Sequence, residues 1–336
     1  MLKRIDFSRS MMITTVVFLF TAGFVTEAKA QIQPIRSIRH PFNDTWIKCV
    51  EFSPDGTMIA TANAGAKIWD VATGELLRTV HQEGNYVQSL AFSPDGRYLV
   101  TGDWEAMVQI WDVKTGERIQ SIKFLPPEEP HVVPWMFVYA VTFSPDGRSV
   151  LANCENLTAL FDVSTGVEMH RFYAGEKYLA FFPDGKSFLT QGGDSNGSVG
   201  WIVDIATGAI IRTFRGVAVL SPDGSRICTS TQENDITILH SQTQDVLCTF
   251  RSDRSFTGVD FSPDGRRLLV GAQVGHYWSG YTYSTDLVGV EGSEMGKILR
   301  TFSSNTSTPT YHVSYSPDGK TVATVVGNTA YLYDIS

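Results

Sequence analysis

The sequence predicts an all-β fold, a seven-bladed β-propeller of four-stranded antiparallel blades, and a recurring turn motif together with its spacing leads to that prediction. A Ser-Pro-Asp-Gly tetrapeptide occurs six times along the chain, and a seventh copy, Phe182-Pro183-Asp184-Gly185, has lost only its serine. The prolines of the seven copies stand at positions 54, 94, 145, 183, 222, 263 and 317. Four of the six steps between these prolines are 38 to 41 residues long, the period of a four-stranded blade. No segment shows the pattern of an amphipathic helix.

The chemistry of this tetrapeptide predicts a tight turn between two strands. Proline fixes φ at the first corner, aspartate accepts hydrogen bonds from the local backbone, and glycine takes the left-handed position. Runs of β-type residues precede and follow it, as at 87–92 and 98–101. Each copy therefore predicts a hairpin between the first and second strands of a blade.

A second motif marks the third strand of each blade and its turn into the fourth. It reads Ile68-Trp69-Asp70-Val71-Ala72-Thr73-Gly74-Glu75 and is repeated with one change at 110–117. Weaker copies stand at 161–166 and 203–208. Four short strands per repeat, in seven repeats, predict a propeller rather than a sandwich.

The two motifs in this order resemble the WD-repeat β-propeller family over nearly all of residues 33–336, and the chain is identified as an exported, bacterial-type member. The resemblance is clearest in the first two blades. In blade five His240-Ser241 stand where the motif has Asp-Val, and in blade six Asp286 is the nearest equivalent of the motif's aspartate. The resemblance implies a binding or scaffold protein rather than an enzyme.

The ends of the repeat region predict how the ring closes. The chain reaches Ser336 just after a third strand, so the last blade lacks its fourth strand. Residues 33–39 stand where a fourth strand precedes the first blade. We expect this N-terminal strand to complete the last blade and to remove the open edge.

The first thirty residues predict a secretory signal peptide. Three basic residues stand among the first nine positions, residues 11–25 form an apolar run, and Ala28-Lys29-Ala30 matches an A-x-A cleavage site. An uncleaved membrane anchor is the alternative, but this run is shorter than the roughly 20 residues of a spanning helix. We therefore expect an exported protein, periplasmic or extracellular, with residues 31–336 as one propeller domain and no stable membrane span after cleavage.

Charge and cysteine content narrow the function further. Residues 31–336 carry ten more acidic than basic side chains, so nucleic acid is not an expected partner.

The four cysteines, Cys49, Cys154, Cys228 and Cys248, show no metal-binding spacing and are expected to be small buried side chains. Cys228 and Cys248 fall on the second and fourth strands of one blade, too far apart for a disulfide.

Searches for catalytic and cofactor motifs give nothing. The seven histidines show no metal-ligand spacing, and neither a G-x-S-x-G elbow nor a phosphate-binding loop is present. We therefore predict no catalytic residues, no metal and no cofactor.

Insertions and aromatic residues point to one loop face as the working surface. Residues 124–137 form an extra loop before blade three, and residues 303–310 are expected to form a polar loop before blade seven. The connections between blades and the turns between second and third strands share one face, which carries the candidate partner-binding residues Trp46, Tyr86, Trp104, Trp135, Tyr277, Trp278 and Tyr311. Exposed aromatics anchor many binding surfaces, although each could instead pack over its own blade.

Two classes of function follow. The first is a non-enzymatic scaffold, expected to be monomeric, that binds a protein, peptide or glycan through the aromatic face. The second is a propeller enzyme or small-ligand-binding protein with a site at the central channel. The first is preferred because no histidine or carboxylate is expected to recur at one register of the first strands.

Overall fold

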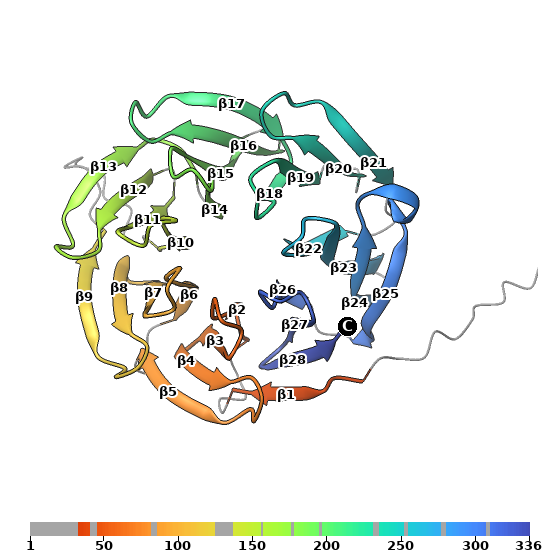
Figure 1. Cartoon of the computed structure of the whole chain (residues 1–336), viewed down its shortest axis with the longest axis horizontal. Coiled ribbons are helices and arrows are strands. Elements are labelled where there is room, and N and C mark those ends of the chain that lie inside the picture. The colour runs from red at the N-terminus through yellow and green to blue at the C-terminus, as the bar shows by residue number, and fades with distance from the viewer. Residues whose placement is uncertain are drawn as a thin grey trace, which may run out of the picture. The chain divides into compact units, whose positions relative to one another are not determined.

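The computed structural model describes residues 33–40, 46–81, 86–124, 137–155, 157–175, 178–194, 197–230, 235–251, 255–276, 280–306 and 310–336. The chain divides into two units, Met1–Gln31 and Ile32–Ser336. The first unit, which includes the predicted signal peptide, lies outside the described residues, so that peptide stays a prediction. The second unit is the predicted propeller, in which seven four-stranded sheets follow one another around a central axis (Figure 1).

Each of the first six blades is a meander of four consecutive antiparallel strands, with the first strand nearest the axis and the fourth at the rim (Figure 1). Blades one to three contain β2 (Cys49–Phe52), β3 (Met58–Asn63), β4 (Gly65–Asp70), β5 (Leu76–His81), β6 (Val87–Phe92), β7 (Tyr98–Asp103), β8 (Met107–Asp112), β9 (Arg118–Lys123), β10 (Ala140–Phe143), β11 (Ser149–Cys154), β12 (Leu157–Asp162) and β13 (Glu168–Phe172). Blades four to six contain β14 (Tyr178–Phe181), β15 (Ser187–Asp194), β16 (Gly197–Asp204), β17 (Ile210–Arg215), β18 (Val217–Leu220), β19 (Arg226–Ser230), β20 (Asp235–His240), β21 (Val246–Arg251), β22 (Ser255–Phe261), β23 (Arg267–His276), β24 (Gly280–Gly289) and β25 (Ile298–Thr306).

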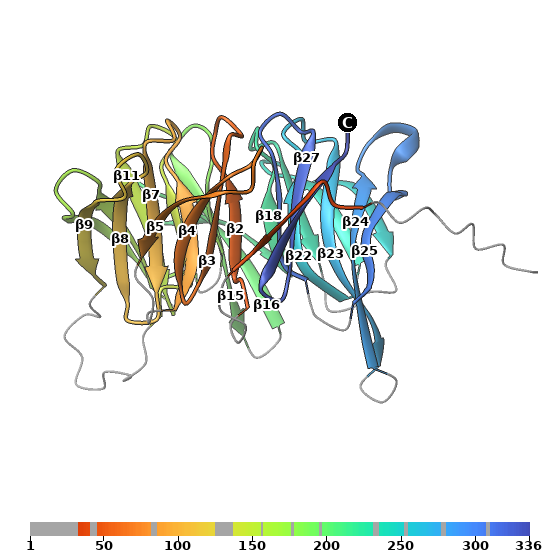
Figure 2. The ribbon, with the colours of Figure 1, turned by 90° about the horizontal axis from the view of Figure 1, so that it is seen from below.

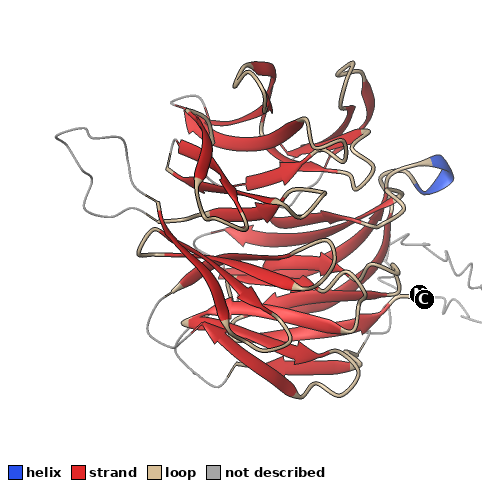
Figure 3. Cartoon of the chain, turned by 60° about the vertical axis from the view of Figure 1, so that its left-hand side comes forward, coloured by secondary structure: helices blue, strands red, loops and turns tan. Residues whose placement is uncertain are grey.

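Strands make up nearly all of the regular structure (Figure 3). The described ranges contain one short 3₁₀ helix, Gly292–Glu294. No helix within those ranges is long and apolar enough to cross a bilayer.

Blade seven is closed by the N-terminal strand, which confirms the prediction from the sequence. Its own strands are β26 (Thr310–Tyr315), β27 (Thr321–Val326) and β28 (Thr329–Asp334), and β1 (Arg36–Arg39) pairs antiparallel with β28 as the fourth. Ile38 lies opposite Ala330 and is buried. Figure 1 shows β1 and β28, from opposite ends of the repeat region, side by side. This pairing leaves no blade short of a strand.

The predicted turns form through short-range hydrogen bonds, illustrated by blade three. The Ser144 hydroxyl donates to Asp146 Oδ1 at 2.6 Å, and the same hydroxyl oxygen accepts the N–H of Ser149 at 3.0 Å. Asp146 Oδ1 also accepts the N–H of Arg148 at 3.0 Å. The tetrapeptide thus specifies the hairpin locally, which accounts for its recurrence in six blades and for the retained Pro-Asp-Gly in blade four.

The core lies between neighbouring blades. Trp69 and Trp111 are buried, and their indole N–H groups donate to the hydroxyls of Thr61 (2.9 Å) and Thr101 (3.0 Å) on the adjacent strand of the same blade. Trp111 of blade two also packs with residues of blade one in a shared apolar cluster. A blade can bury both of its faces only between two neighbours, so the ring is stabilised as a whole.

Blade six departs from the expected layout. Residues 303–306 are not part of a loop but belong to β25, and β23 and β24 are ten residues each, so the extra residues lengthen the strands. The β23–β24 hairpin extends beyond the other strands at one face (Figure 2). Gly289 rather than Asp286 pairs with the first residue of the second strand, as Asp70 does in blade one. Asp286 is instead a buried side chain that accepts a hydrogen bond from Thr301 at 2.7 Å.

The cysteines follow the prediction. All four are free and buried. Cys228 on β19 and Cys248 on β21 both pair with Ile238 of β20, one on each side of that strand. The third strand of blade five therefore separates the two cysteines.

Candidate functional site

Three of the predicted aromatic residues lie in the connections of the loop face. Trp46 and Tyr86 stand just before the first strands of blades one and two, and Trp104 lies in the turn between β7 and β8. The N–H of Trp104 donates to the carbonyl of Tyr86 at 3.0 Å, which ties the turn to the connection. The side chains of Trp46, Tyr86 and Trp104 are 47, 40 and 41% exposed, so they leave a large aromatic area open to solvent.

Asp103 holds the turn that presents Trp104. Its Oδ1 accepts the N–H groups of Glu105 and Met107, each at 2.9 Å. Ala106 takes a positive φ of 57°, which reverses the chain between the two strands. Buried Asp103 therefore fixes the position of the exposed indole at the tip of the turn.

Four aromatic rings form a continuous series of tilted and edge-to-face contacts, referred to below as the aromatic cluster: Tyr86, Trp104, Phe137 and Tyr139. Ring centroids are 4.8 Å apart for Tyr86 and Trp104, 5.2 Å for Trp104 and Phe137, and 6.1 Å for Phe137 and Tyr139. These separations lie in the range of favourable aromatic pairs. The cluster joins the entry to blade two with the entry to blade three, and sequence analysis missed its last two members because they adjoin the long loop.

The other predicted face residues are less informative. Trp135, Tyr277 and Trp278 lie outside the described residues, and of Tyr311 only the backbone, in β26, is described. One further exposed aromatic, Tyr173, follows β13 in the connection to blade four and is 76% exposed. Its position just after a fourth strand is the signal that could have identified it.

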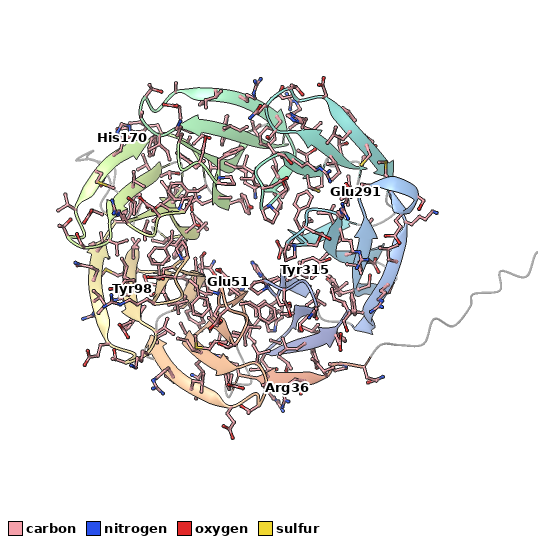
Figure 4. The ribbon with its side chains drawn as sticks, in the orientation of Figure 1. Arg36, Glu51, Tyr98, His170, Glu291 and Tyr315 are labelled. Atoms are coloured by element: carbon pink, nitrogen blue, oxygen red, sulfur yellow. The ribbon has the colours of Figure 1, made fainter. Side chains whose placement is uncertain are left out.

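The wall of the central channel corrects one expectation from the sequence. Glu51 on β2 and Asp260 on β22 each stand three residues before a turn proline, so a carboxylate does recur at one register of the first strands. His312 on β26 stands five residues before its proline, and its electrostatic interaction with Asp260 and Glu51 places it near both acids. β26 packs against both β2 and β22, so blades six, seven and one bring the three side chains together. Figure 4 shows Glu51 on the innermost strand of blade one.

The two carboxylates connect neighbouring blades. Glu51 Oε1 accepts the N–H of Phe92 in blade two at 3.2 Å, and Asp260 Oδ2 accepts the N–H of Tyr315 in blade seven at 2.9 Å. Desolvation raises the pKa of Glu51 to about 7 and that of Asp260 to about 6, against the opposing effect of these hydrogen bonds. Both groups therefore titrate near neutral pH.

His312 lies between these acids. Desolvation lowers its pKa, although the negative charges of Asp260 and Glu51 act in the opposite direction. Its Nε2 is 4.0 Å from the Cys49 sulfur. Burial raises the pKa of the Cys49 thiol to about 12, so Cys49 is a neutral thiol at physiological pH.

A cavity of about 420 Å³ occupies this part of the channel. Its lining comes from the first strands of blades seven and one to four, and includes Glu51, His312, Tyr139 and Tyr178. Tyr139 also belongs to the aromatic cluster, so the cavity and the loop face share a wall. Among the described residues, no group of three or more His, Cys, Asp or Glu side chains is placed to hold a metal ion.

Comparisons with known proteins agree with this architecture. The family model "WD domain, G-beta repeat" matches residues 32–70 and 74–112. The chain is 28% identical over 226 residues to "WD repeat-containing protein WDS homolog" of Arabidopsis thaliana, which is 62% of this chain and 41% of that protein. It is 28% identical over 152 residues to "WD repeat-containing protein SL1-17" of Schistosoma mansoni (43% and 47%), and 29% identical over 151 residues to "Apoptotic protease-activating factor 1" of Rattus norvegicus (44% and 12%).

The fold and the loop face define a closed seven-bladed propeller built from WD-type repeats. The matched repeats begin at a fourth strand and end at a third strand, so each spans two blades, as ring closure by β1 requires. The two matched repeats and the WD-repeat relatives support a WD-repeat β-propeller family for this chain. None of the three relatives is named as an enzyme, in agreement with the prediction of a non-enzymatic protein, and the chain spans less than half the length of each.

Proposed function

We propose that this protein is an exported interaction scaffold whose partner, a protein or a peptide segment of one, docks on the aromatic cluster. The observation that supports this most directly is the series of ring contacts that joins Tyr86, Trp104, Phe137 and Tyr139, of which the first two are 40 and 41% exposed. Large, rigid aromatic side chains lose little conformational entropy on binding and dominate the energetics of many interfaces.

The geometry of the cluster favours an extended ligand over a compact one. Its rings lie along a path from the connection before blade two, over the turn at Trp104, to the start of blade three. Trp46 is a separate exposed aromatic before blade one, with Lys48 Nζ 5.9 Å from its ring centroid. A segment that contacted both places would meet aromatic and cationic groups in one surface of an otherwise acidic chain.

Affinity capture from an extract of the source cells tests the docking site. The full chain serves as bait beside the double variant Tyr86→Ala/Trp104→Ala, and Val246→Ala serves as the matched control because Val246 is 63% exposed at the start of a rim strand of blade five. We expect a partner that wild type and V246A retain and the double variant loses. An equal catch by all three would contradict docking on the aromatic cluster.

A glycan is the second ligand class that exposed tryptophan and tyrosine would suit. Removing glycans enzymatically from the extract before capture separates the two. A protein partner should still be caught, whereas loss of the catch would assign the surface to a glycan.

Export rests on the sequence of residues 1–30. Fractionation followed by N-terminal sequencing tests it, and we expect the protein outside the cytoplasm with Gln31 as its first residue. Recovery from the cytoplasm with the N-terminal segment intact would contradict export.

A further inference from the structure

The cavity in the central channel has the features of a small-ligand site that the scaffold function does not use. It measures about 420 Å³, and its described lining combines apolar side chains and tyrosines with the polar side chains of Lys48, Gln88, Ser89, Thr142 and His312 and with a single carboxylate, that of Glu51. Polar groups that converge in a cavity of this size are typical of sites for small molecules.

One of the two carboxylate oxygens of Glu51 is available to a ligand. Its Oε1 accepts the N–H of Phe92, while Oε2 receives no hydrogen bond from the part of the chain that the structure describes. Between blades four and five a neutral group accepts the equivalent N–H, because the Tyr178 hydroxyl, from a position five rather than three residues before its turn proline, accepts the N–H of Leu220 at 3.4 Å. The link between blades therefore does not require a charge, and the charge of Glu51 is left without a structural explanation.

The surroundings of Glu51 favour a positively charged occupant. His312 of blade seven lines the same cavity, and Asp260 of blade six, which is not among the lining residues, adds a second negative charge near Glu51 and His312. Lys48 lines the cavity toward the loop face, with its Nζ near the Trp46 ring. A cation beside Glu51 would compensate for the loss of water around the carboxylate.

The lining suits an organic molecule better than a metal ion. The described His, Cys, Asp and Glu side chains form no group able to coordinate a metal. The lining tyrosines, Tyr139 and Tyr178, offer aromatic surfaces to the body of an organic molecule and to its ammonium group.

We propose that this cavity binds a small organic cation, with a protonated primary amine paired to Glu51 and the carbon skeleton against Tyr139 and Tyr178. The charged groups of this site lie outside the aromatic cluster, and Tyr139 is the residue that the cavity shares with that cluster.

Ligand-observed NMR and calorimetry on the full chain test the proposal, with 2-phenylethylamine as probe and 2-phenylethanol as its neutral counterpart. At pH 8 we expect the amine to bind at least about tenfold more tightly than the alcohol. Glu51→Gln keeps the acceptor for Phe92 and should reduce the affinity of the amine to that of the alcohol. Glu117→Gln removes an exposed carboxylate from blade two and should change nothing.

A cavity-filling variant guards against indirect effects of E51Q. Thr142 lines the cavity from blade three, so Thr142→Phe should abolish binding of both probes while circular dichroism shows the native fold. Trp104→Ala should leave amine binding unchanged, which keeps this test independent of partner docking.

The pH dependence adds a second readout. The strands packed on β2 bring His312 to Glu51, Asp260 lies beyond it, and the cavity also holds Lys48, Cys49, Tyr139 and Tyr178. Because the pKa of Glu51 is raised to about 7, its charged fraction rises roughly 30-fold between pH 5.5 and 8, and amine affinity should rise more than tenfold. Equal binding of amine and alcohol, no saturable binding of either, or a flat pH profile in the wild type would each overturn the proposal.

Discussion

The carboxylates of the turns and those of the channel wall have opposite electrostatic character, although both accept backbone N–H groups. At the turns, hydrogen bonds lower the pKa of Asp146, first from the Ser144 hydroxyl and then from the N–H of Arg148. At the channel wall, Glu51 accepts one N–H in a poorly hydrated place, and desolvation raises its pKa to about 7. The number of donors and access to water, rather than the residue type, decide the difference.

This contrast assigns different roles to the two regions. The turn carboxylates are charged at all physiological pH values and help to specify the hairpins. The channel carboxylates oppose folding when charged unless a cation compensates them, a common property of binding sites. The rim and turns thus carry the architecture, and the axis carries the groups available for ligands.

The largest expected effect concerns stability and pH. A folded-state pKa raised above its unfolded value gives stability that is present at low pH and lost as pH rises through the folded value, here about 6 for Asp260 and 7 for Glu51. In Glu51→Gln/Asp260→Asn this loss should disappear. The change in unfolding free energy from pH 5 to pH 8 should differ from wild type by about 2 kcal/mol per carboxylate, less than the full shift because the channel keeps them partly solvated.

Urea unfolding at the two pH values measures this difference. Comparison with wild type is needed because burial lowers the pKa values of His40 and His312. These two histidines therefore make the unfolding free energy rise with pH over part of the same pH range. Parallel pH profiles for wild type and the double variant would show that the channel carboxylates behave like those of the turns.

A smaller effect separates two copies of the turn. Asp146 has both a serine hydroxyl and a backbone N–H as donors. In blade four Phe182 replaces the serine, and Asp184 accepts the N–H of Lys186 at 3.0 Å. Asp146→Ala should cost about 1–2 kcal/mol and Asp184→Ala about half as much. Thermal unfolding of the two variants measures this, and equal losses would mean that the serine contributes nothing.

The smallest expected effect is an increase in the unfolding free energy when the irregular turn of blade five is given the usual aspartate. In blade five His240 Nδ1 accepts the N–H groups of Gln242 and Thr243, each at 3.3 Å, where Asp112 of blade two accepts its two at 3.0 and 2.9 Å. His240→Asp should shorten these bonds and add about 0.5 kcal/mol to the unfolding free energy. A lower melting temperature would show that the histidine is needed there.

The sequence by itself determined the propeller, its seven blades and its closure. Each turn is specified by hydrogen bonds within about five residues, as at Ser144, so a local motif reveals the hairpin wherever it recurs. Blade count follows from the number of copies, and the missing fourth strand at Ser336 predicted the pairing of β1 with β28. Blade six was misjudged because its run of serine, threonine and asparagine reads as loop, while pairing with β24 makes it strand.

Only the tertiary structure decided what the propeller brings together. Glu51, Asp260 and His312 lie more than 200 residues apart at their extremes, and they share the channel wall because ring closure places blades six, seven and one next to each other. The aromatic cluster likewise depends on how connections from adjacent blades meet at one face. Local motifs encode turns through short-range bonds, but convergence depends on the order of blades around the axis, which exists only after the ring has closed.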